Sequence, residues 1–342
     1  MKGRVVVCIA AVLLSGAAMP PRVDGARLLA EDPAPKLADY HLFADVAGRV
    51  PAEGVTRYTL NTPLFSDYAE KYRYVWMPPG TAATYTETGV LAFPIGTTIV
   101  KTFAYPADFR TPAADVRAIE TRLLVRRASG WVPLTYVWNA AGTEAVLKRA
   151  GARVAVAFTD AGGKSRQIDY AVPNTNQCKQ CHLSGDAVTP IGPTAANLND
   201  GVQLAALAKS GALTGLPATV PRLTRWDDAA APMAKRARAY LDVNCGHCHS
   251  RTGFASNSGL YLQWDEAAPV HFGVNKRPVA AGRGSGGREF AIVPGNPDAS
   301  ILVHRMQSNE AGVMMPQFGR SVAHDEGVAL VRAYVAEMAL DR

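Results

Sequence analysis

Alternation of hydrophobic and polar residues dominates the first half of the chain, between residues 56 and 173. Tyr72, Tyr74 and Trp76 occupy every second position, which places their side chains on one face of a strand. Three further runs alternate in the same way, over residues 119–125, 131–138 and 154–158. Glycine and proline separate the runs, so the pattern predicts an antiparallel β-rich region, and residues 183–216 follow as a partly helical connection.

Helical spacing replaces alternation in the last third of the chain. Asp227 or Asp228 can cap a helix, and apolar residues then recur at helical intervals over residues 233–244. The glycine-rich stretch 282–287 predicts a mobile surface loop. A closing helix is predicted from about Asp325, with valines on one face.

These patterns predict an α+β protein with two domains. We expect an N-terminal antiparallel β-rich domain at residues 40–215 and an all-α domain at residues 225–342, with the linker near residues 215–224. A chain of 342 residues is long enough for two separate cores.

The N-terminus has the pattern of an export signal. Lys2 and Arg4 precede an apolar run over residues 5–18, which is shorter than a comfortable transmembrane span. The predicted signal covers residues 1–26, with cleavage after Ala18 or near Ala26, and an uncleaved membrane anchor is the alternative. No later segment approaches a membrane span, so we expect a periplasmic protein that does not span the membrane after cleavage.

The charge is mildly basic and spread along the chain. Thirty-six basic side chains against 29 acidic ones give a formal charge of +7. No basic stripe is interleaved with aromatic residues, so we expect no nucleic-acid partner. Periplasmic or membrane-bound redox proteins are the expected partners, because the cysteine motifs described next indicate redox chemistry.

Four of the five cysteines form two close pairs, and each pair is followed directly by a histidine. Cys8 lies in the predicted signal. The two motifs are Cys178-Lys179-Gln180-Cys181-His182 and Cys245-Gly246-His247-Cys248-His249. Both have the C-x-x-C-H pattern of covalent haem attachment, in which two thiols add to the porphyrin and the histidine ligates iron. The sequence therefore predicts two covalently bound c-type haems, held by Cys178, Cys181, His182, Cys245, Cys248 and His249.

Two other uses of paired cysteines fit less well. Zinc ribbons place their pairs about 15 to 20 residues apart and need no trailing histidine. A thioredoxin-like redox pair needs a strand–helix context. Neither accounts for two histidines at the same position in both motifs.

The second half, from about Trp226, resembles class I cytochromes c in its order of helix, C-x-x-C-H motif, methionine loop and closing helix. That resemblance implies that Met315, just before Pro316, is the sixth ligand of the second haem iron. Met314 is the nearest alternative, Met306 is expected to pack on a helix face, and His247 is expected to point to solvent.

The mature chain as a whole resembles a family of bacterial di-haem c-type cytochromes. Three stretches carry that resemblance: residues 61–67 (NTPLFSD), residues 93–103 (from FPIGT to KTF) and residues 120–122 (ETR). The N-terminal half is also similar, more distantly, to β-fold cytochromes whose haem is cross-linked to a lysine, a group that includes hydroxylamine-oxidising enzymes.

Lys101 is a candidate neighbour of the first haem. It alternates with Ile99, Phe103 and Tyr105, so its stem should lie on the apolar face of a strand. A buried lysine is unfavourable without a partner. The alternative is a lysine at a sheet edge that reaches water or pairs with Glu120.

The sequence does not assign the distal ligand of the first haem. The candidates are Met77, Met233, His41, His271, His304 and His324, and an open iron is the remaining alternative. We expect electron transfer as the function. The alternatives are a haem oxidoreductase acting on peroxide, nitric oxide or hydroxylamine at an open first haem, and a haem-based sensing module; no catalytic residue is assigned.

Overall fold

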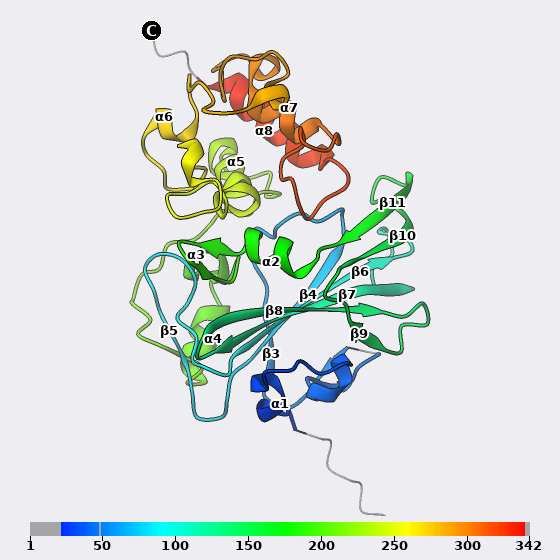
Figure 1. Ribbon diagram of the computed structural model, residues 1–342. Coiled ribbons are helices and arrows are strands. Elements are labelled where there is room, and N and C mark those ends of the chain that lie inside the picture. Colours follow the sequence, from blue (N-terminus) through cyan, green and yellow to red (C-terminus); the bar gives the residue numbers. More distant parts are fainter. Residues whose placement is uncertain (1–21, 48, 339–342) are drawn as a thin grey trace, which may run out of the picture.

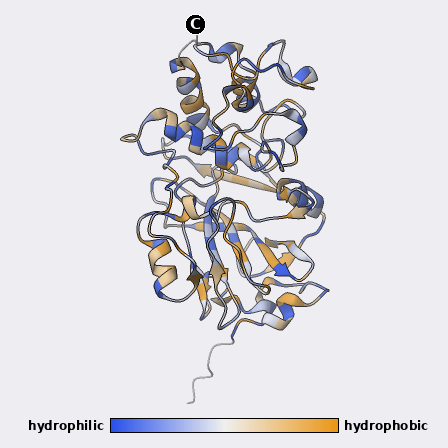
Figure 2. Ribbon diagram, turned by 90° about the vertical axis from the view of Figure 1, so that its left-hand side faces the viewer, coloured by the Kyte–Doolittle hydropathy of each residue, from blue (hydrophilic) through white to orange (hydrophobic). Residues whose placement is uncertain are grey.

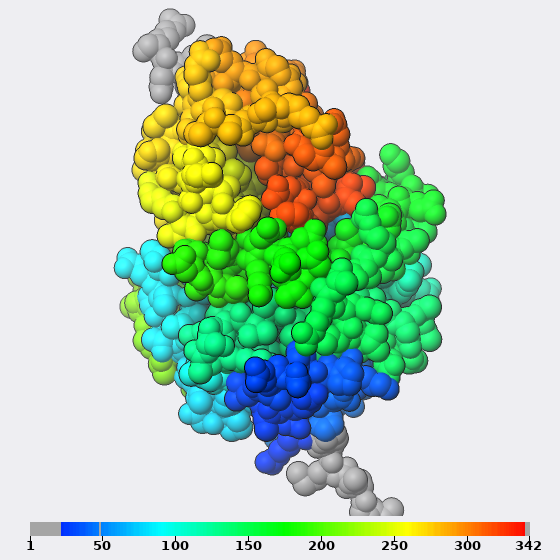
Figure 3. Space-filling model, in the orientation of Figure 1, coloured from blue at the N-terminus to red at the C-terminus, as the bar shows by residue number. Residues whose placement is uncertain are grey.

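The computed structural model describes residues 22–47 and 49–338 of the chain. It is a mixed α+β structure, with an antiparallel β-sheet region in the N-terminal part and helices concentrated in the C-terminal part (Figure 1). In Figure 3 the middle of the chain, in green, lies between the β-rich end and the helical end. The coarse fold class expected from the sequence is therefore confirmed.

A six-stranded antiparallel sheet organises the N-terminal part, in the order β3-β4-β6-β7-β8-β9. Its strands are β3 (Val55–Arg57), β4 (Glu70–Trp76), β6 (Thr98–Pro106), β7 (Val116–Arg127), β8 (Gly130–Trp138) and β9 (Ala145–Leu147). The strands predicted around Tyr74 and over residues 119–125 and 131–138 are therefore confirmed.

Smaller strand pairs surround this sheet. The runs at β10 (Ala152–Thr159) and β11 (Ser165–Val172) form a separate antiparallel ribbon. The other pairs are β1 (Phe43–Asp45) with β2 (Val50–Pro51), β12 (Leu183–Ser184) with β13 (Ala187–Val188), and β5 (Ala83–Thr84) in parallel with β14 (Leu213–Thr214). The last pair lies between the sheet and the predicted linker.

Both faces of the six-stranded sheet are buried. One face carries Tyr74, Val100 and Leu123 and is covered by the N-terminal segment. The opposite face carries Val75, Ile99 and Leu124 and is covered partly by α3 (Ala195–Leu198) and α4 (Gln203–Lys209). Figure 2 shows hydrophobic residues distributed through both the strands and the helices.

Residues between 22 and 40 pack into the hydrophobic core of the sheet. They form α1 (Gly25–Leu29) and the 3-10 turn η1 (Leu37–Tyr40), and Leu28, Leu37 and Tyr40 are fully buried in the core. The segment before the expected boundary at residue 40 thus shares the core of the sheet. Residues 1–21 of the predicted signal lie outside the described residues. Cleavage after Ala18 would leave these contacts intact, whereas cleavage near Ala26 would cut α1.

The C-terminal helices pack around α8 (Asp325–Glu337), the predicted closing helix. The others are α5 (Met233–Leu241), α6 (Pro269–Phe272) and α7 (Ile301–Gln307). The prediction that Asp227 or Asp228 caps the first helix is wrong, because Pro232 occupies that position. The glycine-rich stretch is not simply a surface loop either: it forms the 3-10 turn η4 (Gly282–Ser285), with Gly284 buried against Arg305.

No helix among residues 22–47 and 49–338 is long and apolar enough to cross a membrane.

The burial of α1 gives a direct test of the domain boundary. Leu28→Ala should lower the free energy of unfolding by about 2 to 5 kcal/mol, because Leu28 is completely buried and its removal leaves a cavity. Its neighbour Leu29 is 42% exposed, so Leu29→Ala should change that free energy by less than about 0.5 kcal/mol. Urea unfolding measures both; equal effects would show that α1 is not part of the core.

Candidate haem-binding site

The first motif lies on the short helix α2 (Thr175–Cys181). Asn174 caps its N-terminus in a reciprocal pair with Gln177, which fixes where the helix begins. Cys178 and Cys181 therefore lie one helical turn apart, and His182 is the C-cap. The capping pair makes this position the start of a helix.

His182 is held in the orientation that a metal ligand needs. Its Nδ1 lies 2.7 Å from the carbonyl oxygen of Thr189, across the turn of the β12–β13 hairpin. Burial lowers the pKa of His182 to about 3, so the imidazole is neutral at neutral pH. A neutral ring with Nδ1 bonded to a carbonyl presents Nε2 as a lone-pair donor.

The second motif continues directly from α5. The π-helical turn η2 (Asp242–Gly246) extends that helix to Cys245, and the amides of Cys248 and His249 both donate to the Cys245 carbonyl oxygen. His249 Nδ1 lies 3.4 Å from Ser258 Oγ, and burial lowers its pKa to about 4. The two motifs thus share the same local arrangement of thiols and neutral imidazole.

All four of these cysteines are free thiols. Burial raises the pKa of each of them. In the described part of the chain, no group of three or more His, Cys, Asp or Glu side chains is placed to hold a metal ion by itself. The cysteine pairs thus do not converge in the way that a four-cysteine zinc site requires.

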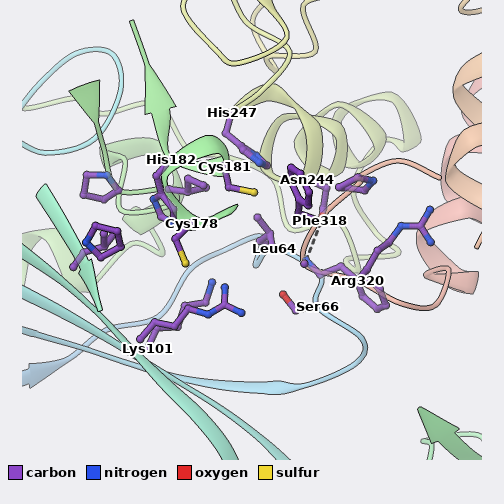
Figure 4. Close-up of a pocket in the computed structure, with 18 of the residues that line it drawn as sticks. Leu64, Ser66, Lys101, Cys178, Cys181, His182, Asn244, His247, Phe318 and Arg320 are labelled. Atoms are coloured by element: carbon purple, nitrogen blue, oxygen red, sulfur yellow. Dashed lines mark hydrogen bonds between the residues drawn. The ribbon is translucent and has the colours of Figure 1, made fainter. Parts of the chain in front are cut away.

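Each motif faces a cavity. The first cavity, lined by Cys178, Cys181 and His182, has about 1260 Å³ of space not filled by atoms, part of it open to solvent. The second cavity, lined by Cys248 and His249, has about 1500 Å³. Figure 4 shows the first cavity between the sheet, α2 and the C-terminal helices.

The two cavities meet at the junction of the two halves. Eight residues line both of them: Cys181, Asn244, Cys245, His247, Met306, Met315, Pro316 and Phe318. The backbone joins the motifs as well, because the Gly185 amide of the β12–β13 turn donates to the Thr252 carbonyl oxygen, three residues beyond His249. The two sites are therefore neighbours that share walls.

The three methionines considered as ligands differ in whether they line the cavities. Met315 lines both cavities, and its amide and carbonyl bond to the Arg305 carbonyl and the Arg320 guanidinium. Met314, the alternative ligand, lines neither cavity. Met306 packs in the helical core, as expected, but it also reaches both cavities.

Among the six candidates for the distal ligand of the first haem, only His324 lines the first cavity. Its ring stacks on Phe65 at 4.2 Å, and Nδ1 lies 3.0 Å from the Tyr240 hydroxyl. Its Nε2 lies 3.5 Å from Glu326, so both nitrogens already have a neighbour.

His247 does not point to solvent, contrary to the sequence prediction. It lines both cavities, and its Nδ1 is a buried atom without a hydrogen-bond partner. Figure 4 shows the side chain directed into the first cavity, above Cys181. The position of His247 inside the motif does not predict where its side chain points, because that direction depends on how the second half of the chain docks on the first.

Lys101 lies on the sheet face expected, and its side chain lines the first cavity. It is not an edge residue, because β4 and β7 flank its strand on both sides. Glu120 does not pair with it either: that carboxylate bonds to Arg122 at 2.5 Å and to the Tyr170 hydroxyl at 2.6 Å. Sequence reasoning missed Arg73 and Arg122, because alternation gives the face of a residue within its own strand but not the cross-strand register that places these two beside Lys101.

The segment 61–67 joins both halves to the site. The Phe65 amide donates to Asn244 Oδ1, and the Asp67 carboxylate accepts bonds from the Ser321 amide, the Ser321 hydroxyl and the Val322 amide. Leu64, Phe65 and Ser66 line the first cavity between these two anchors. These bonds fix the sheet domain against the helix that carries the second motif and against the loop that follows Met315.

Comparisons of this chain with protein-family models, with curated proteins and with solved structures gave no match.

Proposed function

We propose that this protein is a di-haem c-type cytochrome that transfers electrons outside the cytoplasmic membrane. The observation that carries the proposal is that two C-x-x-C-H motifs, far apart in the sequence, present free thiols and neutral imidazoles to two cavities that share walls. Covalent attachment would use Cys178 and Cys181 in the first cavity, and Cys245 and Cys248 in the second.

The residues present fit two haems. His182 would ligate the first iron, and His249 and Met315 would ligate the second. When bound, the haems would supply one-electron chemistry at iron. The protein's contribution is to orient the imidazoles, through Thr189 and Ser258, and to surround the sites with apolar side chains.

The shared walls favour a relay over two independent sites. Cys181 of the first motif and Cys245 and His247 of the second line the same space. Groups held in the two cavities would therefore be separated by these few side chains. This arrangement supports electron passage within one molecule, from one partner redox protein to another.

One observation favours a second function, that of a haem oxidoreductase on a small substrate. Four cationic side chains, those of Arg73, Lys101, Arg122 and Arg320, line the first cavity. His324 is already engaged by Tyr240 and Phe65. An open first iron would bind carbon monoxide or cyanide, and two six-coordinate irons would not. Optical titration with each ligand distinguishes this function from simple electron transfer.

Haem content is the primary test of the proposal. Protein matured in a periplasm with c-haem assembly should carry two covalent haems by intact mass. Cys178→Ser with Cys181→Ser should remove one haem, and Cys245→Ser with Cys248→Ser should remove the other, because each pair supplies both thioether bonds.

The control is the unaltered chain expressed without the assembly machinery, which should weigh no more than the polypeptide. If the matured protein also has that mass, or holds only zinc, the proposed function is wrong.

The Met315 assignment has a matched control in its neighbour. Met315→Ala should lower the reduction potential of the second haem and let it bind carbon monoxide, because a thioether ligand raises the potential and closes the site. Met314→Ala should leave both properties unchanged, since Met314 lines neither cavity. Spectroelectrochemical titration measures the potentials; equal effects of the two variants would contradict the assignment.

A further inference from the structure

Three cationic residues lie directly opposite one another across three adjacent strands. In the register of the sheet, Arg73 of β4 pairs with Lys101 of β6, and Lys101 pairs with Arg122 of β7. All three side chains line the first cavity. We call Arg73, Lys101 and Arg122 the cationic row.

Like charges directly opposite each other in a sheet are destabilising, and burial makes the repulsion stronger. Arg73 is 8% exposed, and Lys71, one pleat along the same face, adds another cation. Burial, followed by the neighbouring cations, lowers the pKa of Lys101 well below its ordinary value. Burial also lowers the pKa of Lys71 to about 7.

A protein carboxylate neutralises the row at the Arg122 end and not at Arg73 or Lys101. The Glu120 carboxylate accepts hydrogen bonds from Arg122 and from the Tyr170 hydroxyl, so it is engaged at the Arg122 end of the row. The Lys101 ammonium lies 4.8 Å from the centre of the Phe103 ring and forms no salt bridge with a described residue. Arg73 donates through Nη1 to the Lys71 carbonyl oxygen, while its Nη2 is buried without a partner. The row therefore has unused donors at Arg73 and Lys101.

The surroundings place these donors beside the first motif. On the far side of Arg122, the cross-strand register continues to Thr135 of β8. Thr135 lines the same cavity as Cys178 and His182. Figure 4 shows Lys101 below Cys178 and His182, reaching up from the sheet toward the cavity. Apolar side chains such as Leu64, Ile99 and Leu134 form much of the remaining wall.

We propose that the cationic row is a binding site for a carboxylate or a similar oxyanion. A guanidinium with a free nitrogen and an adjacent ammonium match such a group in charge and in hydrogen-bond donors. Two sources supply this chemistry: the propionate groups of the first haem, in which case the inference rests on the proposed function, or a small oxyanion from solution. In either case a bound anion would offset the repulsion along the row and favour the ammonium form of Lys101.

The test compares Lys101→Met and Arg73→Gln with Arg117→Gln, an exposed arginine on β7. Each variant is matured with haem, and the potential of the first haem is measured with and without added formate. If the row holds propionates, Lys101→Met and Arg73→Gln should shift the one-electron redox equilibrium about tenfold, or about 59 mV, toward the oxidised state. Formate should then have no effect on any of the proteins.

If the row binds a free oxyanion, formate should give a saturable spectral change in the unaltered protein. The affinity for formate should fall at least tenfold in Lys101→Met and Arg73→Gln, and it should be unchanged in Arg117→Gln. The inference is overturned if the first two variants match Arg117→Gln in both potential and formate response. Neither change adds buried charge, and the two variants check each other if one does not fold.

Failure of the proposed function would be visible separately, as a polypeptide mass without haem. The effect of formate would then be measured on the melting temperature of the haem-free chain. If formate raises the melting temperature of the unaltered protein but not that of Lys101→Met, the row is supported as an oxyanion site. No rise would overturn it.

Discussion

The hydrogen bonds of the segment 61–67 are the interaction on which the site depends. Thr62 bonds to the linker at the Thr224 carbonyl oxygen, Phe65 to Asn244 beside the second motif, and Asp67 to the Ser321–Val322 backbone. Each of these partners lies more than 150 residues further along the chain. Because Asn61, Thr62 and Asp67 are buried, losing a bond would leave an unsatisfied polar group inside the protein. The segment therefore holds the two halves in one arrangement.

That arrangement explains why the two cavities are neighbours. If the C-terminal helices docked elsewhere, they would retain their own motif and their own methionine loop. They would not bring Cys245 and His247 to the cavity of Cys178 and Cys181, nor extend Met315 to both cavities. The same docking closes the first cavity over the sheet face that carries the cationic row. The proposed electron relay and the proposed anion site thus depend on one interface.

Much of the fold could be predicted from the sequence, because strand alternation and helical spacing are local properties. The strands around Tyr74, Leu123 and Phe158 were predicted, as was the helix that starts at Asp325. The predictions failed where a capping or packing partner decided the outcome. Pro232 sets the start of α5 in place of an aspartate.

By itself the sequence determined the candidate chemistry: thiol pairs with an adjoining histidine are recognisable because their spacing is short and their residue types are specific. It also placed Lys101 on the right face of its strand. Only the tertiary structure decided which residues the two cavities share, that His247 turns inward, and that Arg73 and Arg122 stand on either side of Lys101. The physical reason is that cross-strand register and domain docking join residues far apart in the chain, and no local periodicity encodes such contacts.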